Sequence, residues 1–139
     1  MQKIIFDCER MKYPDTGLYH YCLNLGKYLE KNIDPRKEEL FFYTPPREQG
    51  WSASRANHIT QHPLHRFFFP PFRSFDIWHS TNQYSNYMPM LNRKIRVVLT
   101  IHDLNFLYDE KKNAAKRQKY IRTIQVLINR ADAIVCISG

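Results

Sequence analysis

The chain has 139 residues, 43% hydrophobic and 24% charged, which is enough apolar material for one globular domain with a single core. It contains no run of about 18 uncharged apolar residues and does not start with the long apolar stretch of a signal peptide, so we expect a cytoplasmic protein without a membrane-spanning helix. The formal net charge of +8 predicts an anionic partner, but it does not choose among nucleic acid, anionic lipid headgroups and phosphorylated substrates.

The three cysteines, Cys8, Cys22 and Cys136, are widely spaced and lie inside apolar runs. Their odd number and the lack of any C-x-x-C pair argue against a disulfide framework and against a zinc site. We therefore expect three buried free thiols.

The first half of the chain predicts a strand, a helix and a second strand. Residues 3–8 form a short β-branched run that leads into a turn at 13–17. The turn is followed by apolar residues spaced four, three and four apart, which is one face of a helix: Leu18, Cys22, Leu25 and Leu29. A second strand at 40–43 ends at two prolines. This order is the βαβ unit of a parallel sheet with a right-handed crossover.

The second half continues the alternation. We expect at most one weak strand between residues 47 and 74, followed by strands at 76–79 and 95–101, a helix at 114–131 and a last strand at 133–137. The predicted fold class is α/β, with a Rossmann-like, mostly parallel sheet and helices on both faces. Ligands of such sheets gather at the carboxyl ends of the strands, which here carry Asp7-Cys8, His79-Ser80-Thr81, His102-Asp103 and Ser138-Gly139.

The turn before the first helix, with Thr16, Gly17 and Leu18, is the first candidate site. A glycine there lets the free N–H groups of a helix N-terminus face an anion such as a phosphate, or it simply permits a tight turn. The segment matches neither G-x-G-x-x-G nor the P-loop pattern, so neither a self-sufficient dinucleotide site nor a P-loop is expected.

His102 and Asp103 follow the strongest predicted strand and form the second candidate site. Such a pair binds hydroxyl groups, accepts a proton or orients a neighbour. The alternative is that Asp103 caps the next turn and His102 is a polar residue satisfied at a strand end.

The segment His79–Gln83 is a cluster of hydrogen-bonding side chains suited to binding a polyol such as a sugar, and its candidate sugar-binding residues are His79, Ser80, Thr81 and Asn82. Ser80 does not stand in a G-x-S-x-G nucleophile elbow, which argues against hydrolase triad chemistry.

Three further features concern metals and surfaces. His58, His62 and His65 form a loose cluster, but Pro63 would disrupt a shared helical face, so no metal site is expected. Arg66–Arg73 mixes arginine with phenylalanine, and Lys111–Arg130 holds seven Lys or Arg residues and no acid. Aromatics between cations suit single-stranded nucleic acid or a membrane interface, and a basic helix face can also be merely solvated.

Four blocks, in order and on the βαβ plan, carry a resemblance over nearly the whole chain. They are Asp15-Thr16-Gly17-Leu18-Tyr19-His20-Tyr21, Trp78-His79-Ser80 followed by Pro89, Val97-Val98-Leu99-Thr100-Ile101-His102-Asp103-Leu104, and Ala131-Asp132-Ala133-Ile134-Val135-Cys136-Ile137-Ser138. Together they resemble the N-terminal domain of family 4 (group 1) glycosyltransferases of the GT-B fold.

The resemblance implies transfer of a sugar from a nucleotide-sugar donor, the co-substrate, to a glycan or lipid-linked acceptor, usually with retention and without a metal or other cofactor. It implies that Gly17 and its neighbours approach the donor phosphates. It also implies that His102 touches the transferred sugar and that Asp103 supports His102 or the acceptor.

The sequence departs from the family at Tyr19, where a second glycine is common, and it stops at Ser138-Gly139, where the family continues with an acidic residue and a second Rossmann-like domain. We therefore expect residues 1–139 to be an acceptor-side domain that lacks the C-terminal donor-binding domain and does not turn over substrate alone. The alternative is a basic binding module for RNA or anionic membrane surfaces, with nucleic acid the less favoured partner. A peripheral position at the inner face of an anionic membrane is a further expectation, based on the basic helix and the Arg66–Arg73 run.

Overall fold

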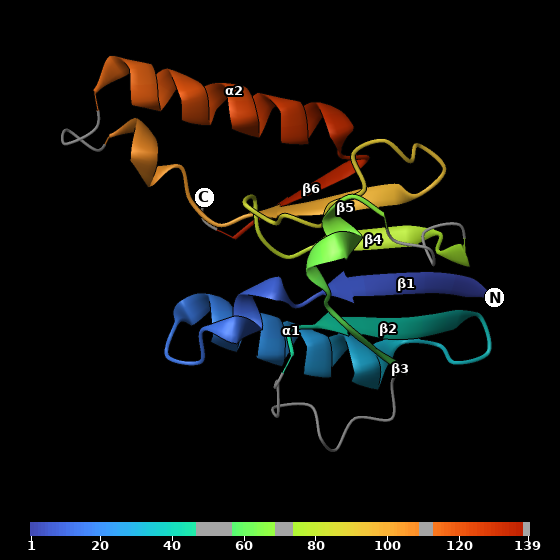
Figure 1. Cartoon of the computed structure of the whole chain (residues 1–139). Helices are drawn as coiled ribbons and strands as arrows, with labels where there is room; N and C mark the ends of the chain where they lie inside the picture. The colour runs from blue at the N-terminus through green and yellow to red at the C-terminus, as the bar shows by residue number, and fades with distance from the viewer. Residues whose placement is uncertain (47–56, 69–73, 109–112, 138–139) are drawn as a thin grey trace.

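The computed structural model describes residues 1–46, 57–68, 74–108 and 113–137. They form a six-stranded sheet in the order β3-β2-β1-β4-β5-β6, in which every neighbouring pair is parallel (Figure 1). This is the strand order of Rossmann folds, and the direction of winding reverses between β1 and β4. The predicted α/β Rossmann-like class is confirmed.

The elements lie close to their predicted positions. The strands are β1 (Gln2–Asp7), β2 (Glu38–Thr44), β3 (Asn57–Thr60), β4 (Ile77–Ser80), β5 (Arg96–Ile101) and β6 (Ala133–Cys136). The α-helices are α1 (Gly17–Asn32) and α2 (Ala114–Arg130), and three short 3-10 helices are η1 (Glu9–Lys12), η2 (Pro63–Arg66) and η4 (Asn105–Leu107).

The sheet buries an apolar cluster on each face because successive side chains of a strand point to opposite sides. Ile5 of β1 joins the cluster that meets Leu127 of α2. The next residue, Phe6, joins the cluster that Cys22 and Leu25 of α1 cover. The two α-helices therefore cover opposite faces of the sheet, as predicted.

Helix α1 begins where its sequence predicts. The Thr16 hydroxyl oxygen accepts a hydrogen bond from the backbone N–H of Tyr19 at 3.2 Å, which satisfies one of the free N–H groups of the first turn. The helix ends at Asn32, two residues before the Asp34-Pro35 break. Gly26 is buried, so it belongs to the face of α1 that packs on the sheet.

Two side chains near the C-terminal edge differ from the predictions. Arg130, expected among the polar positions of a basic helix, is only 3% exposed and donates to the carbonyl oxygens of Pro89, Asn92 and Ile95. Cys136 is exposed, whereas Cys8 and Cys22 are buried. Cys136 belongs to β6, the edge strand of the sheet, which has a strand on one side alone.

No helix in the described parts of the chain combines the length and the apolar character that a bilayer crossing requires. Some predicted features fall outside the described residues: Ser138-Gly139 at the end of the last strand, Phe69–Arg73 of the aromatic-basic run, and Lys111 and Lys112 at the start of the basic stripe.

Candidate functional site

The strand order directs attention to the carboxyl ends of β1 and β4, where the winding of the sheet reverses and Rossmann folds form their ligand crevice. Asp7 ends β1 and Ser80 ends β4, and the two residues are partners in the parallel ladder. The segment after β4 then contacts the end of β1, where Thr81 and Ser85 form hydrogen bonds with Asp7.

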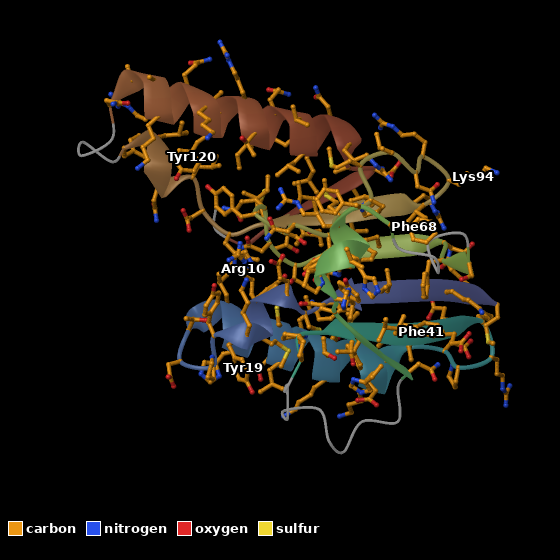
Figure 2. The ribbon with its side chains drawn as sticks, in the orientation of Figure 1. Arg10, Tyr19, Phe41, Phe68, Lys94 and Tyr120 are labelled. Atoms are coloured by element: carbon orange, nitrogen blue, oxygen red, sulfur yellow. The ribbon has the colours of Figure 1, made fainter. Side chains whose placement is uncertain are left out.

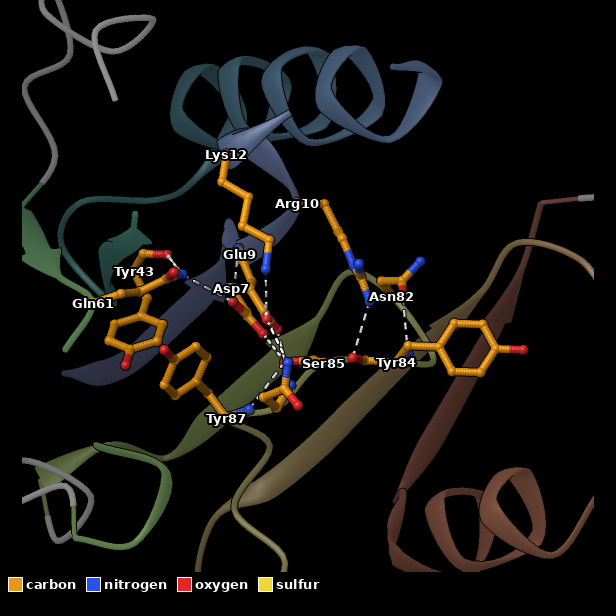
Figure 3. A network of polar contacts seen from close by, with 11 residues as sticks. Asp7, Glu9, Arg10, Lys12, Tyr43, Gln61, Asn82, Tyr84, Ser85 and Tyr87 are labelled. Atoms are coloured by element: carbon orange, nitrogen blue, oxygen red, sulfur yellow. Dashed lines mark hydrogen bonds and ion pairs between the residues drawn. The ribbon is translucent and has the colours of Figure 1, made fainter. Parts of the chain in front are cut away.

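Asp7 is the buried centre of a polar network at this edge (Figure 3). One carboxyl oxygen, Oδ1, accepts from the backbone N–H of Glu9 at 3.0 Å and from Gln61 Nε2 at 3.5 Å. The other oxygen accepts a hydrogen bond from the Ser85 hydroxyl. Burial raises the pKa of Asp7 to about 7, since removal from water disfavours the charged form. The group therefore changes charge near neutral pH.

Glu9 and Arg10 join the start of η1 to the same loop. The Glu9 carboxylate accepts from the backbone N–H of Asn86 at 2.8 Å and from its Nδ2 at 2.7 Å, and it pairs with Lys12 Nζ at 3.5 Å. Arg10 donates through Nη2 to the carbonyl oxygen of Tyr84 at 3.0 Å. Its Nε is buried without a hydrogen-bond partner among the described residues. The loop after β4 is thus held at the end of β1 by two contacts, one through Asn86 to Glu9 and one through Tyr84 to Arg10.

The four residues predicted to bind a sugar are largely enclosed: His79, Ser80, Thr81 and Asn82. The Ser80 hydroxyl donates to the carbonyl oxygen of Asn82 at 3.2 Å, and Asn82 Oδ1 accepts from the backbone N–H of Tyr84 at 2.8 Å. The Thr81 hydroxyl donates to the carbonyl oxygen of Asp7 at 2.6 Å. In this structure these side chains shape the loop, and their predicted contact with an acceptor stays a prediction.

His79 lies between the sheet and α1. Its Nε2 is 3.0 Å from Thr100 Oγ1, and its ring meets the Phe6 ring edge to face at 5.3 Å. Burial lowers the pKa of His79 to about 4, because the charged imidazolium would lose its hydration. His79 is therefore neutral at physiological pH.

His102 is held from three sides at the end of β5. Its Nε2 lies 2.7 Å from the carbonyl oxygen of Thr81, and a carbonyl only accepts, so Nε2 carries a proton and donates it. The backbone N–H of His102 donates to Gln83 Oε1 at 3.0 Å. The ring of Tyr21, in the second turn of α1, meets the His102 ring edge to face at 4.6 Å. The structure therefore brings His102 against α1.

Asp103 is exposed, and its Oδ1 accepts from the backbone N–H of Asn105 at 3.0 Å, at the start of η4. This is the turn-capping contact that the sequence left open as an alternative. The carbonyl oxygen of Asp103 accepts from Gln83 Nε2 at 2.8 Å, so Gln83 joins the backbone of both candidate residues.

The N-terminus of α1 is open at Gly17. A Cβ atom at this position would have no atom within 4 Å apart from its chain neighbours and the backbone of its own helix, and the φ angle of Gly17 lies outside the left-handed region. Neither packing nor backbone strain therefore requires a glycine here. The neighbouring Thr16 is exposed and donates its hydroxyl to the carbonyl oxygen of Tyr13 at 2.8 Å, while Leu18 is half-buried.

This edge of the sheet thus combines an open helix N-terminus, an oriented imidazole and a buried carboxyl group that titrates near neutral pH. Comparison with family models, curated proteins and solved structures found no match. The chemistry of this edge therefore follows from its residues and their geometry.

Residues important to this edge lay outside the sequence-based set, among them Glu9 and Tyr21, whereas Gln83 belonged to the predicted cluster of hydrogen-bonding side chains after the 76–79 strand. Asp7 was noted only as one of the strand-end residues. Its position after a buried apolar strand is visible in the sequence, but Ser85, its partner, stands 78 positions away. Nothing local in the sequence connects such pairs.

The described residues contain no group of three or more His, Cys, Asp or Glu side chains that could hold a metal ion. His62 caps η2 by accepting from the backbone N–H of Leu64, and His65 Nδ1 lies 3.0 Å from the Tyr43 hydroxyl. Both histidines thus have local structural roles next to Pro63.

Proposed function

We propose that this chain is the acceptor-side Rossmann-like domain of a GT-B glycosyltransferase, which transfers a sugar from a nucleotide-sugar donor to a hydroxyl group of a glycan or lipid-linked acceptor. The observation that carries the proposal is the contact of His102, at the end of β5, with Tyr21 of α1, whose N-terminus is open at Gly17. The contact supports the proposal because a helix N-terminus that can face an anion and an imidazole that can bind a hydroxyl lie on adjoining elements of one sheet edge.

In the proposed reaction the bond between the anomeric carbon and the diphosphate oxygen breaks, the acceptor hydroxyl oxygen forms a new bond to that carbon, and the hydroxyl proton passes to the departing diphosphate. Negative charge builds up on the departing diphosphate. The N–H groups of Gly17 and Leu18, with the dipole of α1 behind them, stabilise this charge, and the neighbouring Thr16 holds the turn through its hydroxyl contacts. The proposal follows the resemblance in taking the reaction to be retaining and independent of a metal.

His102 contacts the transferred sugar in this scheme. Its Nε2–H donates to the carbonyl oxygen of Thr81, which limits rotation of the ring and fixes its orientation at the end of β5. The exposed carboxylate of Asp103 accepts a hydrogen bond from an acceptor hydroxyl. In this scheme the segment from His79 to Asn82 lines the acceptor position next to His102 and Asp103. A second Rossmann-like domain supplies the contacts to the nucleoside.

The test is an NMR titration of the isotope-labelled chain with UDP-, GDP- and ADP-sugars, inorganic pyrophosphate and simple methyl glycosides. We expect weak binding that shifts the amide signals of Gly17 and Leu18 with pyrophosphate and with nucleotide sugars, and the imidazole signals of His102 with the sugars. The Gly17→Ala variant should fold normally, because its methyl group meets no protein atom, and should lose the pyrophosphate response. Lys27→Ala, an exposed change on the same helix, is the matched control.

Absence of any shift at Gly17, or an undiminished response in Gly17→Ala, would argue against the phosphate position. Release of nucleoside diphosphate by the purified chain alone would contradict its assignment as one half of an enzyme.

A further inference from the structure

Two exposed apolar loops, far apart in the sequence, form one surface. Phe67 and Phe68 follow η2 and are 84% and 72% exposed, and Leu91, in the connection from β4 to β5, is 97% exposed. Phe67 and Leu91 line the same cavity, of about 430 Å³. Large apolar side chains this open to water, on neighbouring loops, indicate a surface that meets another apolar phase.

The same loops carry exposed cations. Arg66 adjoins Phe67, with its guanidinium carbon 5.9 Å from the centre of the Phe67 ring, and Arg93 and Lys94 follow Leu91. Between Asn57 and His102 the sequence contains one acid, Asp76, whose carboxylate accepts from the backbone N–H of Lys3 at 2.7 Å. We call the six residues Arg66, Phe67, Phe68, Leu91, Arg93 and Lys94 the docking patch.

The backbone beneath the docking patch is held in place. The guanidinium of Arg130 donates to the carbonyl oxygens of Pro89 and Asn92 at 2.7 Å and of Ile95 at 2.8 Å, which fixes the connection on both sides of Leu91. On the other loop, His62 caps η2. Binding through the docking patch therefore requires little further ordering of the backbone, which would otherwise weaken the association.

We propose that the docking patch places this domain on an anionic lipid bilayer. Phe67, Phe68 and Leu91 enter the boundary between headgroups and acyl chains, while Arg66, Arg93 and Lys94 meet lipid phosphates. A lipid surface fits better than nucleic acid, because the most exposed apolar residue, Leu91, has no ring on which a base could stack.

The docking patch adjoins the candidate functional site on one side, because the cavity that Phe67 and Leu91 line is also lined by Ser85 and Asn86, the partners of Asp7 and Glu9. Lys94 and Phe68 lie toward the amino ends of the strands, and Arg10 and Tyr19 lie at the carboxyl ends (Figure 2). The inference rests on the exposed side chains of the docking patch and not on the proposed glycosyl transfer, and none of the six patch residues is a named residue of the candidate site.

The experiment is co-sedimentation of the full chain with phosphatidylcholine vesicles, with and without added phosphatidylserine, at low and high salt. We expect binding that requires the anionic lipid and weakens with salt. The triple change Phe67→Ser, Phe68→Ser and Leu91→Ser, and separately Arg66→Gln, Arg93→Gln and Lys94→Gln, should each weaken binding by about tenfold or more.

Controls use exposed residues elsewhere: Tyr28→Ser with Val126→Ser for apolar loss, and Lys116→Gln, Lys119→Gln and Arg122→Gln for charge loss. Circular dichroism melts confirm that each variant is folded. Equal binding to neutral and anionic vesicles, or an equal loss in the controls, would overturn the proposal. The proposal would also be overturned if the chain did not bind vesicles but bound a short RNA in a salt-sensitive way, and the docking-patch variants abolished that binding. The surface would then be a nucleic-acid site.

Discussion

The buried side chain of Gln83 accepts a hydrogen bond from the backbone N–H of His102 at 3.0 Å and donates one to the carbonyl oxygen of Asp103 at 2.8 Å. One carboxamide therefore holds the peptide unit that precedes His102 and the peptide unit that follows Asp103. Gln83 also ties the loop after β4 to the end of β5, and this fixes the backbone position from which the His102 side chain extends.

Replacing Gln83 by leucine should lower the free energy of unfolding by about 1–3 kcal/mol, because a backbone donor and a backbone acceptor lose their partner in a partly buried site. The imidazole signals of His102 should also shift. Urea unfolding and NMR measure the two effects. Gln125→Leu is the control, since Gln125 is exposed and bonds only to Asn129 across the surface of α2 among its described contacts. Equal effects of the two changes would refute this role of Gln83.

Asp7 and His79 should make opposite contributions to the pH dependence of stability. Between pH 3.8, the ordinary pKa of an aspartate, and the raised pKa of about 7, folded Asp7 holds a proton that the unfolded chain has released, so stability falls as pH rises. Between the lowered pKa of about 4 and the ordinary 6.5, His79 is protonated only in the unfolded chain, so stability rises with pH. The two contributions largely cancel in their shared range.

The Asp7→Asn variant should reveal the first of these contributions. Its stability relative to the unchanged chain should increase from pH 4 to 7, by on the order of 4 kcal/mol, because the cost of burying the ionised carboxylate is removed. Urea unfolding at a series of pH values measures this difference. Asp103→Asn, at an exposed carboxylate, is the control. A pH-independent difference for Asp7→Asn would show that Asp7 does not titrate in this range.

The His79→Gln variant should show the opposite trend. Relative to the unchanged chain its stability should fall as pH rises from 4 to 6.5, by on the order of 3 kcal/mol, because the contribution of the neutral buried imidazole is lost. The same pH series measures it, and His20→Gln, on the exposed side of α1, controls for the loss of a histidine. A relative stability that stays constant or rises with pH would contradict the assignment.

Arg130→Lys should destabilise the fold by about 2 kcal/mol or more, although charge is conserved, because one ammonium group cannot reach the three carbonyl oxygens that the guanidinium spans. Urea unfolding measures the loss. Arg122→Lys on the exposed face of the same helix should change stability by no more than about 0.5 kcal/mol. Similar losses for the two substitutions would mean that the Arg130 contacts contribute little.

The sequence by itself determined the elements and the fold class. Helix α1 follows from the spacing of Leu18, Cys22, Leu25 and Leu29, and β5 follows from a continuous β-branched run. These signals are local, because the 3.6-residue period of a helix and the apolar run of a buried strand are complete within one segment. The carboxyl ends that carry Asp7 and His102 could be read from the same pattern once the strands were placed.

Only the tertiary structure decided which polar residues are buried and with which partners. Arg130 lies in a run of basic residues, yet its carbonyl partners stand 35 to 41 positions earlier in the chain. Asp7 contacts Ser85, 78 positions later in the chain, and Glu9 contacts Asn86, 77 positions later. Because burial and hydrogen bonding depend on segments that meet only when the chain has folded, no local pattern distinguishes these residues from solvated ones.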